Sequence, residues 1–413
     1  MRGTPGSCDV LVVGAGLAGL ACALDLSRAG LSVHILEASD GVGGRMRTDR
    51  RNGFLLDRGF QVFNTSYPQV KRRLSLRDLR LRPFTPGILV HREGRRLLVA
   101  DPTRRPRAAA GLLSGRLLSG RDAAALGLLS ARDMLQPVAT LKRRPDRTTI
   151  TDLAAAGVSD DAIDALLRPF LSGVFLEDEL ETSARFFHLV WRSLTRGTLC
   201  LPADGIGAVP AQLAAGLPAG TVSLETPVRS VDDGAVVLED GGERAARAVV
   251  VATDPRTAAR LLPGLAVPAT RTVTTYYHAT DVPPLGEPTL LVDSRRRILN
   301  SCVPSQVTAS YAPVNRSLVS TSVLGPDAPG REQEVRGHLG DAYGADTGSW
   351  ELVGTYTVDG ALPAMTPPWP LSRTTRFAAG RYVCGDHRAT GSVQGALASG
   401  ARAAREVLAG IGG

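Results

Sequence analysis

The chain has 413 residues, 43% of them hydrophobic, and this composition can support about two or three domains with hydrophobic cores. No segment reaches the roughly 18 consecutive apolar residues of a membrane-spanning helix, so none is expected. The net charge is +8, which raises the question of a nucleic-acid partner. The basic clusters, such as Lys71-Arg72-Arg73 and Arg295-Arg296-Arg297, lack interleaved aromatic residues. We therefore expect solvated surface there and no nucleic acid.

The cysteines are odd in number and widely spaced, at Cys8, Cys22, Cys200, Cys302 and Cys384. They form no CxxC pair and no Cys/His cluster, so the sequence predicts neither a disulfide framework nor a metal site. We expect reduced thiols and a cytoplasmic protein.

The first predicted elements form a nucleotide-binding turn. An apolar strand at Val10–Val13 runs into Gly14-x-Gly16-x-x-Gly19, and a helix follows over residues 17–29. Gly14 permits a tight turn, Gly16 lets the backbone approach a pyrophosphate, and Gly19 allows the helix to pack close to the strand. The N-terminal amides of the helix then face the phosphates.

A second strand, Ser32–Leu36, brings Glu37 to its tip, where a carboxylate can accept hydrogen bonds from ribose hydroxyls. This order of strand, glycines, helix, strand and acid predicts a dinucleotide site, and leaves NAD and FAD as alternatives. The continuation Gly43-Gly44-Arg45 favours FAD, because it matches the extension that follows the ribose acid in flavoproteins.

Two further segments carry a family resemblance. GFLLDRGFQVF, at Gly53–Phe63, and RYVCGDHRATGSVQGALASGARAAREVL, at Arg381–Leu408, are similar to segments of the flavin amine oxidase and phytoene desaturase superfamily, which includes the protoporphyrinogen oxidases. The resemblance implies that Gly385-Asp386 meets the ribityl and pyrophosphate region of FAD. It also implies that a helix beginning near Ser392 points its amides at the flavin pyrimidine, where a reduced flavin carries negative charge.

A third match, weaker than these, begins at Leu201–Leu217 and continues through a hairpin at Asp232-Asp233-Gly234. It implies a strand that holds Val228 near the adenine and a buried strand at Ala248–Ala252. Noncovalent FAD is expected, although His387 lies close enough to the flavin segment to keep covalent attachment open. The residues expected to bind FAD are Gly14, Gly16, Leu17, Ala18, Gly19, Glu37, Ala38, Gly43, Gly44, Arg45, Gly59, Phe60, Val228, Thr253, Gly385, Asp386, Ser392 and Val393.

The predicted fold class is α/β, with a Rossmann-like FAD-binding domain of the glutathione-reductase and amine-oxidase type and a discontinuous α+β substrate domain. The FAD-binding domain is expected to comprise residues 1–66, 200–265 and 370–413. The substrate domain is expected to comprise residues 67–199 and 266–369. From Tyr67 to about Leu199 the apolar spacing is mainly helical, and after Pro268 it alternates as in antiparallel strands.

The segment Ala108–Leu141 is amphipathic, leucine-rich and flanked by arginines. This pattern is typical of a helix that lies on a membrane surface, and equally of a helical cap over a substrate cavity. Peripheral membrane contact therefore stays open, as does the oligomeric state.

A flavin accepts a hydride at N5, so the protein mainly has to place a C–H bond against the ring and exclude water. Amine oxidases of the family commonly carry a lysine near N5 and an aromatic residue at the start of the C-terminal helix. This chain has no lysine after Lys142, and Ser392 stands at the helix start. We therefore expect an FAD-dependent oxidase, dehydrogenase or desaturase that forms C=C or C=N on a mostly apolar small molecule. The alternatives are an amine oxidase and a redox-neutral isomerase or mutase, and the electron acceptor, oxygen, a quinone or a protein, stays open.

Substrate-facing residues are predicted from strand alternation. Tyr276 and His278 share one orientation along a strand and are our candidates for a polar, catalytic pair above the flavin. Other aromatic and histidine side chains that could line the cavity are His188, Trp191, Tyr277, Tyr356 and Trp369.

Overall fold

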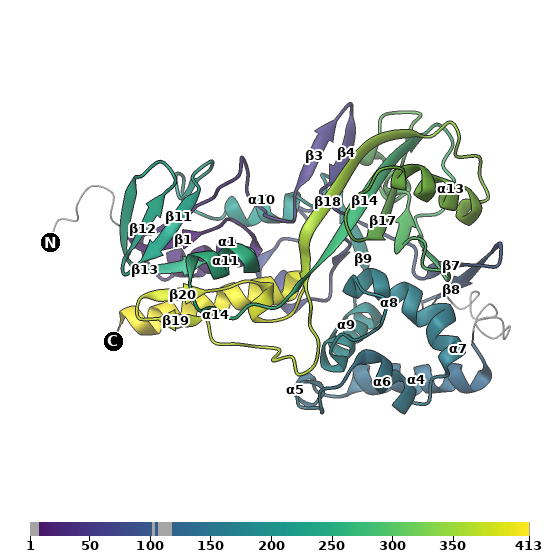
Figure 1. The fold of residues 1–413 in the computed structure, drawn as a ribbon, viewed down its shortest axis with the longest axis horizontal. Coiled ribbons are helices and arrows are strands. Elements are labelled where there is room, and N and C mark those ends of the chain that lie inside the picture. Colours follow the sequence, from purple (N-terminus) through teal and green to yellow (C-terminus); the bar gives the residue numbers. More distant parts are fainter. Residues whose placement is uncertain (1–7, 101–103, 106–117, 413) are drawn as a thin grey trace.

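The computed structural model describes residues 8–100, 104–105 and 118–412. It contains a mostly parallel sheet, a large antiparallel sheet and a group of helices, which occupy separate regions of the molecule (Figure 1). The mixed α/β fold agrees with the predicted fold class. The predicted division into two discontinuous domains stays a prediction.

The first sheet has the strand order β10-β2-β1-β13-β12-β11, and β20 pairs with β13 and with β19. Strands β1, β2, β10, β13 and β20 pair in parallel, while β11 and β12 form the predicted antiparallel hairpin. The last four residues of β1 and of β13, residues 10–13 and 248–251, are apolar and buried, as is typical of central parallel strands. The strands are β1 (Cys8–Val13), β2 (Val33–Leu36), β10 (Val222–Ser223), β11 (Val228–Asp232), β12 (Ala235–Leu238), β13 (Glu243–Val251), β19 (Arg376–Ala378) and β20 (Arg381–Val383).

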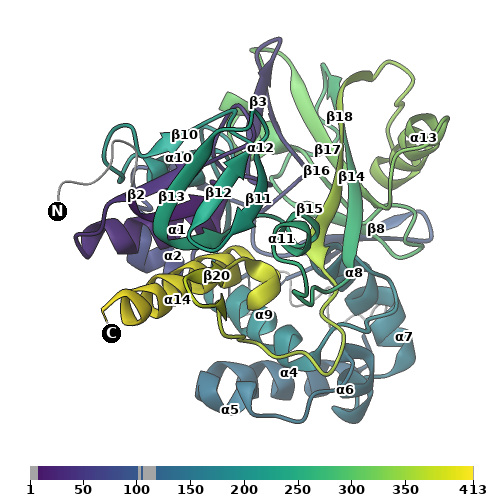
Figure 2. The ribbon, with the colours of Figure 1, turned by 60° about the vertical axis from the view of Figure 1, so that its left-hand side comes forward.

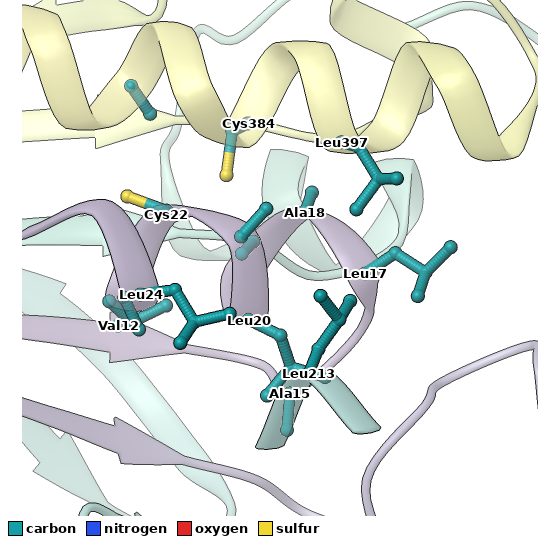
Figure 3. Packing of buried hydrophobic residues seen from close by; sticks show 14 of the residues in the cluster. Val12, Ala15, Leu17, Ala18, Leu20, Cys22, Leu24, Leu213, Cys384 and Leu397 are labelled. Carbon is teal, nitrogen blue, oxygen red and sulfur yellow. The ribbon is translucent and has the colours of Figure 1, made fainter. Parts of the chain in front are cut away.

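Helices from the two ends of the chain pack together on this sheet. The first helix, α1 (Leu17–Arg28), lies beside α14 (Val393–Ile411), and Figure 3 shows Ala18 and Leu397 in the space between them. A Cβ added to Gly400 would lie 2.2 Å from the carbonyl oxygen of Ala18. The glycine therefore permits the close approach that brings the N-terminal and C-terminal segments to one place.

The second sheet has the order β18-β14-β17-β16-β15-β7-β8, with all neighbours antiparallel except β15 and β7. Helix α13 (Arg331–Tyr343) packs on one of its faces, as Figure 2 also shows. The strands are β7 (Ile88–Arg92), β8 (Arg95–Val99), β14 (Thr270–Thr280), β15 (Leu290–Asp293), β16 (Asn300–Cys302), β17 (Ser317–Leu324) and β18 (Glu351–Pro363).

The prediction of a mainly helical stretch between Tyr67 and Leu199 is wrong for residues 81–99. Strand β6 (Leu81–Pro83) and the hairpin of β7 and β8 occupy this region. Glu93 and Gly94 both have positive φ at the turn of that hairpin, a geometry that favours a tight two-residue connection. The pairing of β7 with β15 joins residues about 200 positions apart in the chain, which local periodicity does not reveal.

Helices dominate residues 120–196 and form one apolar cluster below the second sheet (Figure 1). Among these helices His188 is buried between two carboxylates, with Nδ1 2.7 Å from Asp133 Oδ2 and Nε2 2.8 Å from Asp152 Oδ2. This contact joins three helices, α4, α6 and α9. The helices are α4 (Gly120–Leu135), α5 (Val138–Lys142), α6 (Thr149–Ala155), α7 (Asp160–Ala162), α8 (Arg168–Phe175) and α9 (Ala184–Arg196), and a π-helical turn at Ile163–Leu167 leads into α8.

The remaining elements connect these parts. Strands β3 and β4 form a hairpin, and β5, β9 and β6 form a small sheet. Within the described residues no helix has both the length and the apolar character needed to cross a membrane. The connecting elements are β3 (Thr48–Arg51), β4 (Phe54–Asp57), β5 (Phe63–Asn64), β9 (Leu199–Pro202), α2 (Pro68–Arg73), α10 (Ala208–Ala214), α11 (Pro255–Leu261) and α12 (Pro304–Val307).

Candidate active site

A cavity of about 690 Å³ extends from the glycine turn after β1 to the helices α8 and α9. The structure brings the residues expected to bind FAD together along its wall, from segments at both ends and in the middle of the sequence. All of them except Gly19 line the cavity. That these residues bind FAD is a prediction from the sequence, and their common position on the cavity wall supports it.

The glycine turn leaves no room for side chains at two of its positions. Gly14 has a φ of +105°, and a Cβ there would lie 2.9 Å from the carbonyl oxygen of Ala252. A Cβ on Gly19 would lie 2.1 Å from the carbonyl oxygen of Gly14. Gly19 thus serves the packing of α1 against the turn, as the sequence predicts, and has no place on the cavity wall.

Glu37 follows β2 and lines the cavity. Its Oε2 accepts a hydrogen bond from the N–H of Ala15 at 2.6 Å, and its Oε1 accepts bonds from Ser39 N at 3.0 Å and Ser39 Oγ at 2.7 Å. These bonds hold the carboxylate in one orientation. Because each carboxylate oxygen has two lone pairs, it can still accept a hydrogen bond from a ribose hydroxyl.

An ion pair connects two of the segments that are expected to bind FAD. Arg45 Nη2 lies 2.8 Å from Asp386 Oδ1, and Arg45 Nη1 donates to the carbonyl oxygen of Ala361 in β18 at 2.8 Å. Gln61 in turn donates from Nε2 to the carbonyl oxygen of Arg45 at 2.8 Å. The guanidinium therefore links the loop after β2 to the C-terminal segment and to the second sheet at one part of the cavity.

Helix α14 begins at this cavity. The hydroxyl of Ser392 caps the helix by accepting a hydrogen bond from Gly395 N at 3.0 Å, and the first turn carries no acidic side chain. Ser392 and Val393 line the cavity. The positive end of a 19-residue helix therefore faces the site, where it stabilises negative charge.

The far end of the cavity is apolar. Its wall consists mainly of side chains from α8 and α9, completed by residues of the second-sheet strands β14, β15, β16, β17 and β18. Sequence reasoning did not identify these residues individually, because helical periodicity shows which residues share a face but not which face lines a cavity. The residues from these helices are Phe170 and Val174 of α8 and Phe186, Val190 and Leu194 of α9, and Leu176 directly follows α8.

The structure does not bring the predicted catalytic pair to the cavity. Tyr276 and His278 do share a face of β14, but it is the face that packs on α13. The Tyr276 hydroxyl donates to Asp327, and His278 Nε2 lies 2.9 Å from Glu332 Oε1. Burial raises the pKa of Tyr276 and lowers that of His278. Strand alternation identified a shared face correctly and assigned it to the wrong side of the sheet.

The other side chains predicted to line the cavity also lie outside its wall, and each makes a hydrogen bond elsewhere in the fold. Trp191 donates to Ser130 Oγ and Trp369 donates to the carbonyl oxygen of Ala389. The residues in question are His188, Trp191, Tyr277, Tyr356 and Trp369.

His387 follows Asp386 and is almost fully buried, at 1% exposure. Burial lowers the pKa of His387 to about 4, so its imidazole is neutral at pH 7. Neither His387 nor Cys384 lines the cavity. This placement supports noncovalent binding of FAD.

A parallel sheet with a glycine turn, an acid after its second strand and a C-terminal helix facing the same cavity define an FAD-dependent oxidoreductase. The family model described as flavin containing amine oxidoreductase matches residues 17–408. The chain belongs to this family, and FAD is its cofactor.

Similar proteins agree with this assignment. The hydroxysqualene dehydroxylase of Rhodopseudomonas palustris is 30% identical over 98% of this chain and 99% of the relative. The enzyme of the same name from Sinorhizobium fredii is 27% identical over 96% of this chain and 97% of its own. Among solved structures, cyclohexylamine oxidase from Brevibacterium oxydans shares the fold with a TM-score of 0.72 at 17% identity, covering 98% of this chain and 100% of the oxidase.

Proposed function

We propose that the protein catalyses a two-electron reaction on a mostly apolar small molecule, in which a hydride leaves a C–H bond and C=C or C=N forms. The apolar end of the cavity carries this proposal, because burying apolar surface there is the main interaction the wall offers to a substrate. Bound FAD supplies the hydride acceptor, its N5 atom. The chain supplies the binding, the orientation and the exclusion of water.

The two ends of the cavity would bind the cofactor and the substrate separately. The glycine turn, Glu37 and the Arg45–Asp386 pair would hold the cofactor at one end of the cavity. Phe170 and Phe186 contribute aromatic walls at the other end. A substrate between them lies in a space with few competing waters, where a C–H bond can be held in one orientation.

The cavity offers less to an amine. In a buried site a carboxylate is the usual counter-charge of a protonated amine. Among the described residues, the acids on the cavity wall are Glu37, Asp254 and Asp386, all in the region assigned to the cofactor. No acidic side chain of the described chain lines the apolar end, so an ammonium group would be desolvated there without a counter-charge.

A second candidate is removal of a hydroxyl group from a long isoprenoid. The similarity to two hydroxysqualene dehydroxylases over nearly the whole chain favours it. If hydrogen replaces the hydroxyl, the reaction consumes two electrons and releases water, so reduced flavin is needed at the start. Desaturation instead ends with reduced flavin, which separates the two candidates experimentally.

The test uses the purified holoenzyme under anaerobic conditions. Oxidised enzyme is mixed with polyenes, porphyrinogens and amines, and bleaching of the flavin identifies a hydride donor. Dithionite-reduced enzyme is mixed with hydroxysqualene, and return of the flavin colour with loss of the hydroxyl identifies a dehydroxylase. Bleaching by small polar amines alone, with no reaction of any apolar compound, would contradict the proposal of a mostly apolar substrate.

A pair of variants connects the reaction to the apolar end. Val190→Trp fills part of the cavity and should reduce turnover while FAD is retained, because the substrate loses its space. Val314→Trp changes a side chain that is 89% exposed and outside the cavity wall, and serves as the control. Equal turnover in the two variants would show that the apolar end does not hold the substrate.

We also propose that α4 contacts a membrane surface, from which an apolar substrate could be taken. Leu128 and Leu135 lie seven positions apart on this helix and are 74% and 83% exposed. Residues 108–117 of the predicted amphipathic segment lie outside the described residues. Sedimentation with anionic phospholipid vesicles tests the proposal, and binding should weaken in Leu135→Glu. Equal vesicle binding by wild-type protein and Leu135→Glu would contradict the proposed membrane contact.

A further inference from the structure

The apolar end of the cavity contains one polar side chain without a partner. Asn300 in β16 lines the cavity and is 8% exposed. Its Oδ1 is buried with no hydrogen-bond partner. Buried amide groups in native proteins nearly always have partners, so an unpaired one on a cavity wall indicates a missing ligand group.

Asn300 belongs to a short polar row across the sheet. It is paired in register with Ser322 of β17, which is paired with Thr275 of β14. Ser322 Oγ lies 3.1 Å from Thr275 Oγ1, and Phe60 N donates to Thr275 Oγ1 at 3.3 Å. Phe60 is a predicted flavin contact, so the row begins beside the cofactor region and ends at Asn300.

The facing helix leaves room for this amide. Gly173 of α8 also lines the cavity, and a Cβ there would lie 3.0 Å from Asn300 Nδ2. Any larger residue at that position would press on the amide. The other lining residues on α8 and α9 are apolar, so the Asn300 end of the polar row faces an apolar wall.

We propose that Asn300, assisted by Ser322, binds a hydroxyl group on an otherwise apolar substrate and so determines both its specificity and its position. A hydroxyl group donates and accepts hydrogen bonds, so it satisfies the amide in either orientation of the carboxamide. An ammonium group can only donate, and the polar row has no carboxylate to balance its charge. This inference rests on the proposed function, because it assumes an apolar substrate at this end of the cavity.

The experiment measures binding of a matched pair, hydroxysqualene and squalene, to the oxidised holoenzyme. Perturbation of the flavin absorption on titration reports binding without turnover. Wild-type protein should bind the alcohol more tightly than the hydrocarbon. Asn300→Leu, which has a similar size, should weaken binding of the alcohol by about 5- to 100-fold and leave the hydrocarbon unaffected or tighter.

Two further variants make the result specific. Gly173→Ala keeps Asn300 but displaces its amide, and should reduce the preference for the alcohol even if Asn300→Leu fails to fold. Leu194→Ala removes an apolar contact and should weaken both ligands alike. FAD content and Tm are recorded for each variant.

The outcomes separate the two proposals. A preference for the alcohol that disappears in Asn300→Leu and Gly173→Ala supports the hydroxyl site. Equal binding of both ligands by wild-type protein, or an unchanged preference in the variants, overturns it and leaves the apolar substrate in place. Failure of wild-type protein to bind either ligand contradicts both.

Discussion

Asp57 is a buried carboxyl group whose ionisation should destabilise the folded protein. It is 1% exposed. Its Oδ1 accepts hydrogen bonds from Thr48 Oγ1 at 2.6 Å and Ile206 N at 2.9 Å, and its Oδ2 accepts one from the Tyr311 hydroxyl at 2.8 Å. Burial outweighs these bonds and raises the pKa of Asp57 to about 6.

The rise from the ordinary value of 3.8 to about 6 corresponds to about 3 kcal/mol that disfavours the charged form in the folded state. Below about pH 4 both folded and unfolded states keep the proton, and Asp57 adds no pH dependence. Between about pH 4 and 6 the unfolded state loses its proton first, so the free energy of unfolding falls as the pH rises. Above about pH 6 Asp57 is ionised in both states, and the free energy of unfolding stays lower by the full amount of about 3 kcal/mol.

Asp57→Asn should remove this penalty. The amide keeps an oxygen for Thr48 and Ile206, and its NH₂ group can donate to the hydroxyl of Tyr311. We expect the variant to be more stable than wild-type protein at pH 7 by up to about 3 kcal/mol, with the difference shrinking as the pH falls toward 4.

Urea unfolding of both proteins, followed by tryptophan fluorescence at several pH values between 4 and 7, measures the difference. Asp293→Asn is the control. Asp293 is also buried, but hydrogen bonds from Arg297 and His91 outweigh burial and lower its pKa, so its variant should lose stability at pH 7. A stability difference between Asp57→Asn and wild-type protein that does not change with pH would refute the reasoning.

Three further predictions concern other parts of the structure. Gly19→Val places a side chain where a Cβ would lie 2.1 Å from a backbone oxygen of the turn, and should weaken FAD binding about tenfold or more, as measured by fluorescence titration of the apoprotein. Arg45→Met leaves the buried Asp386 without its cation and should lower Tm by about 4 °C or more, whereas Arg45→Lys should retain part of the stability. Burial of His188 is outweighed by its two aspartate partners, which raise its pKa above 6.5. Its stabilising charge is therefore present below pH 6.5 and lost as the pH rises through the raised value, a dependence that His188→Gln should lack in urea unfolding.

The cofactor half of the site could be predicted because one ligand imposes local constraints on the sequence. The turn needs glycine where Gly14 and Gly19 leave no space for a Cβ, and the acid must stand at the end of the second strand. These requirements fall within a few dozen residues and in fixed order. Gly385-Asp386 and the helix capped by Ser392 lie far along the chain, and the family resemblance of their segment identified them.

The substrate half could not be predicted in this way, because tertiary contacts decide it. Alternation showed that Tyr276 and His278 share a face, but only the position of α13 shows which side that is. Asn300 has no motif around it, and its isolation becomes visible only when β16, β17 and α8 are placed around the cavity. Its one sequence signal is a polar residue within a short strand, which is common in sheets.

The most direct measurement is the flavin content of the purified protein. We predict a yellow protein, or a colourless apoprotein that takes up FAD, with FAD released by denaturation in an amount approaching one per chain, and with the flavin retained in Tyr276→Phe and His278→Gln, whose side chains face α13. A protein that stays colourless and does not take up added FAD would contradict the assignment of the cavity.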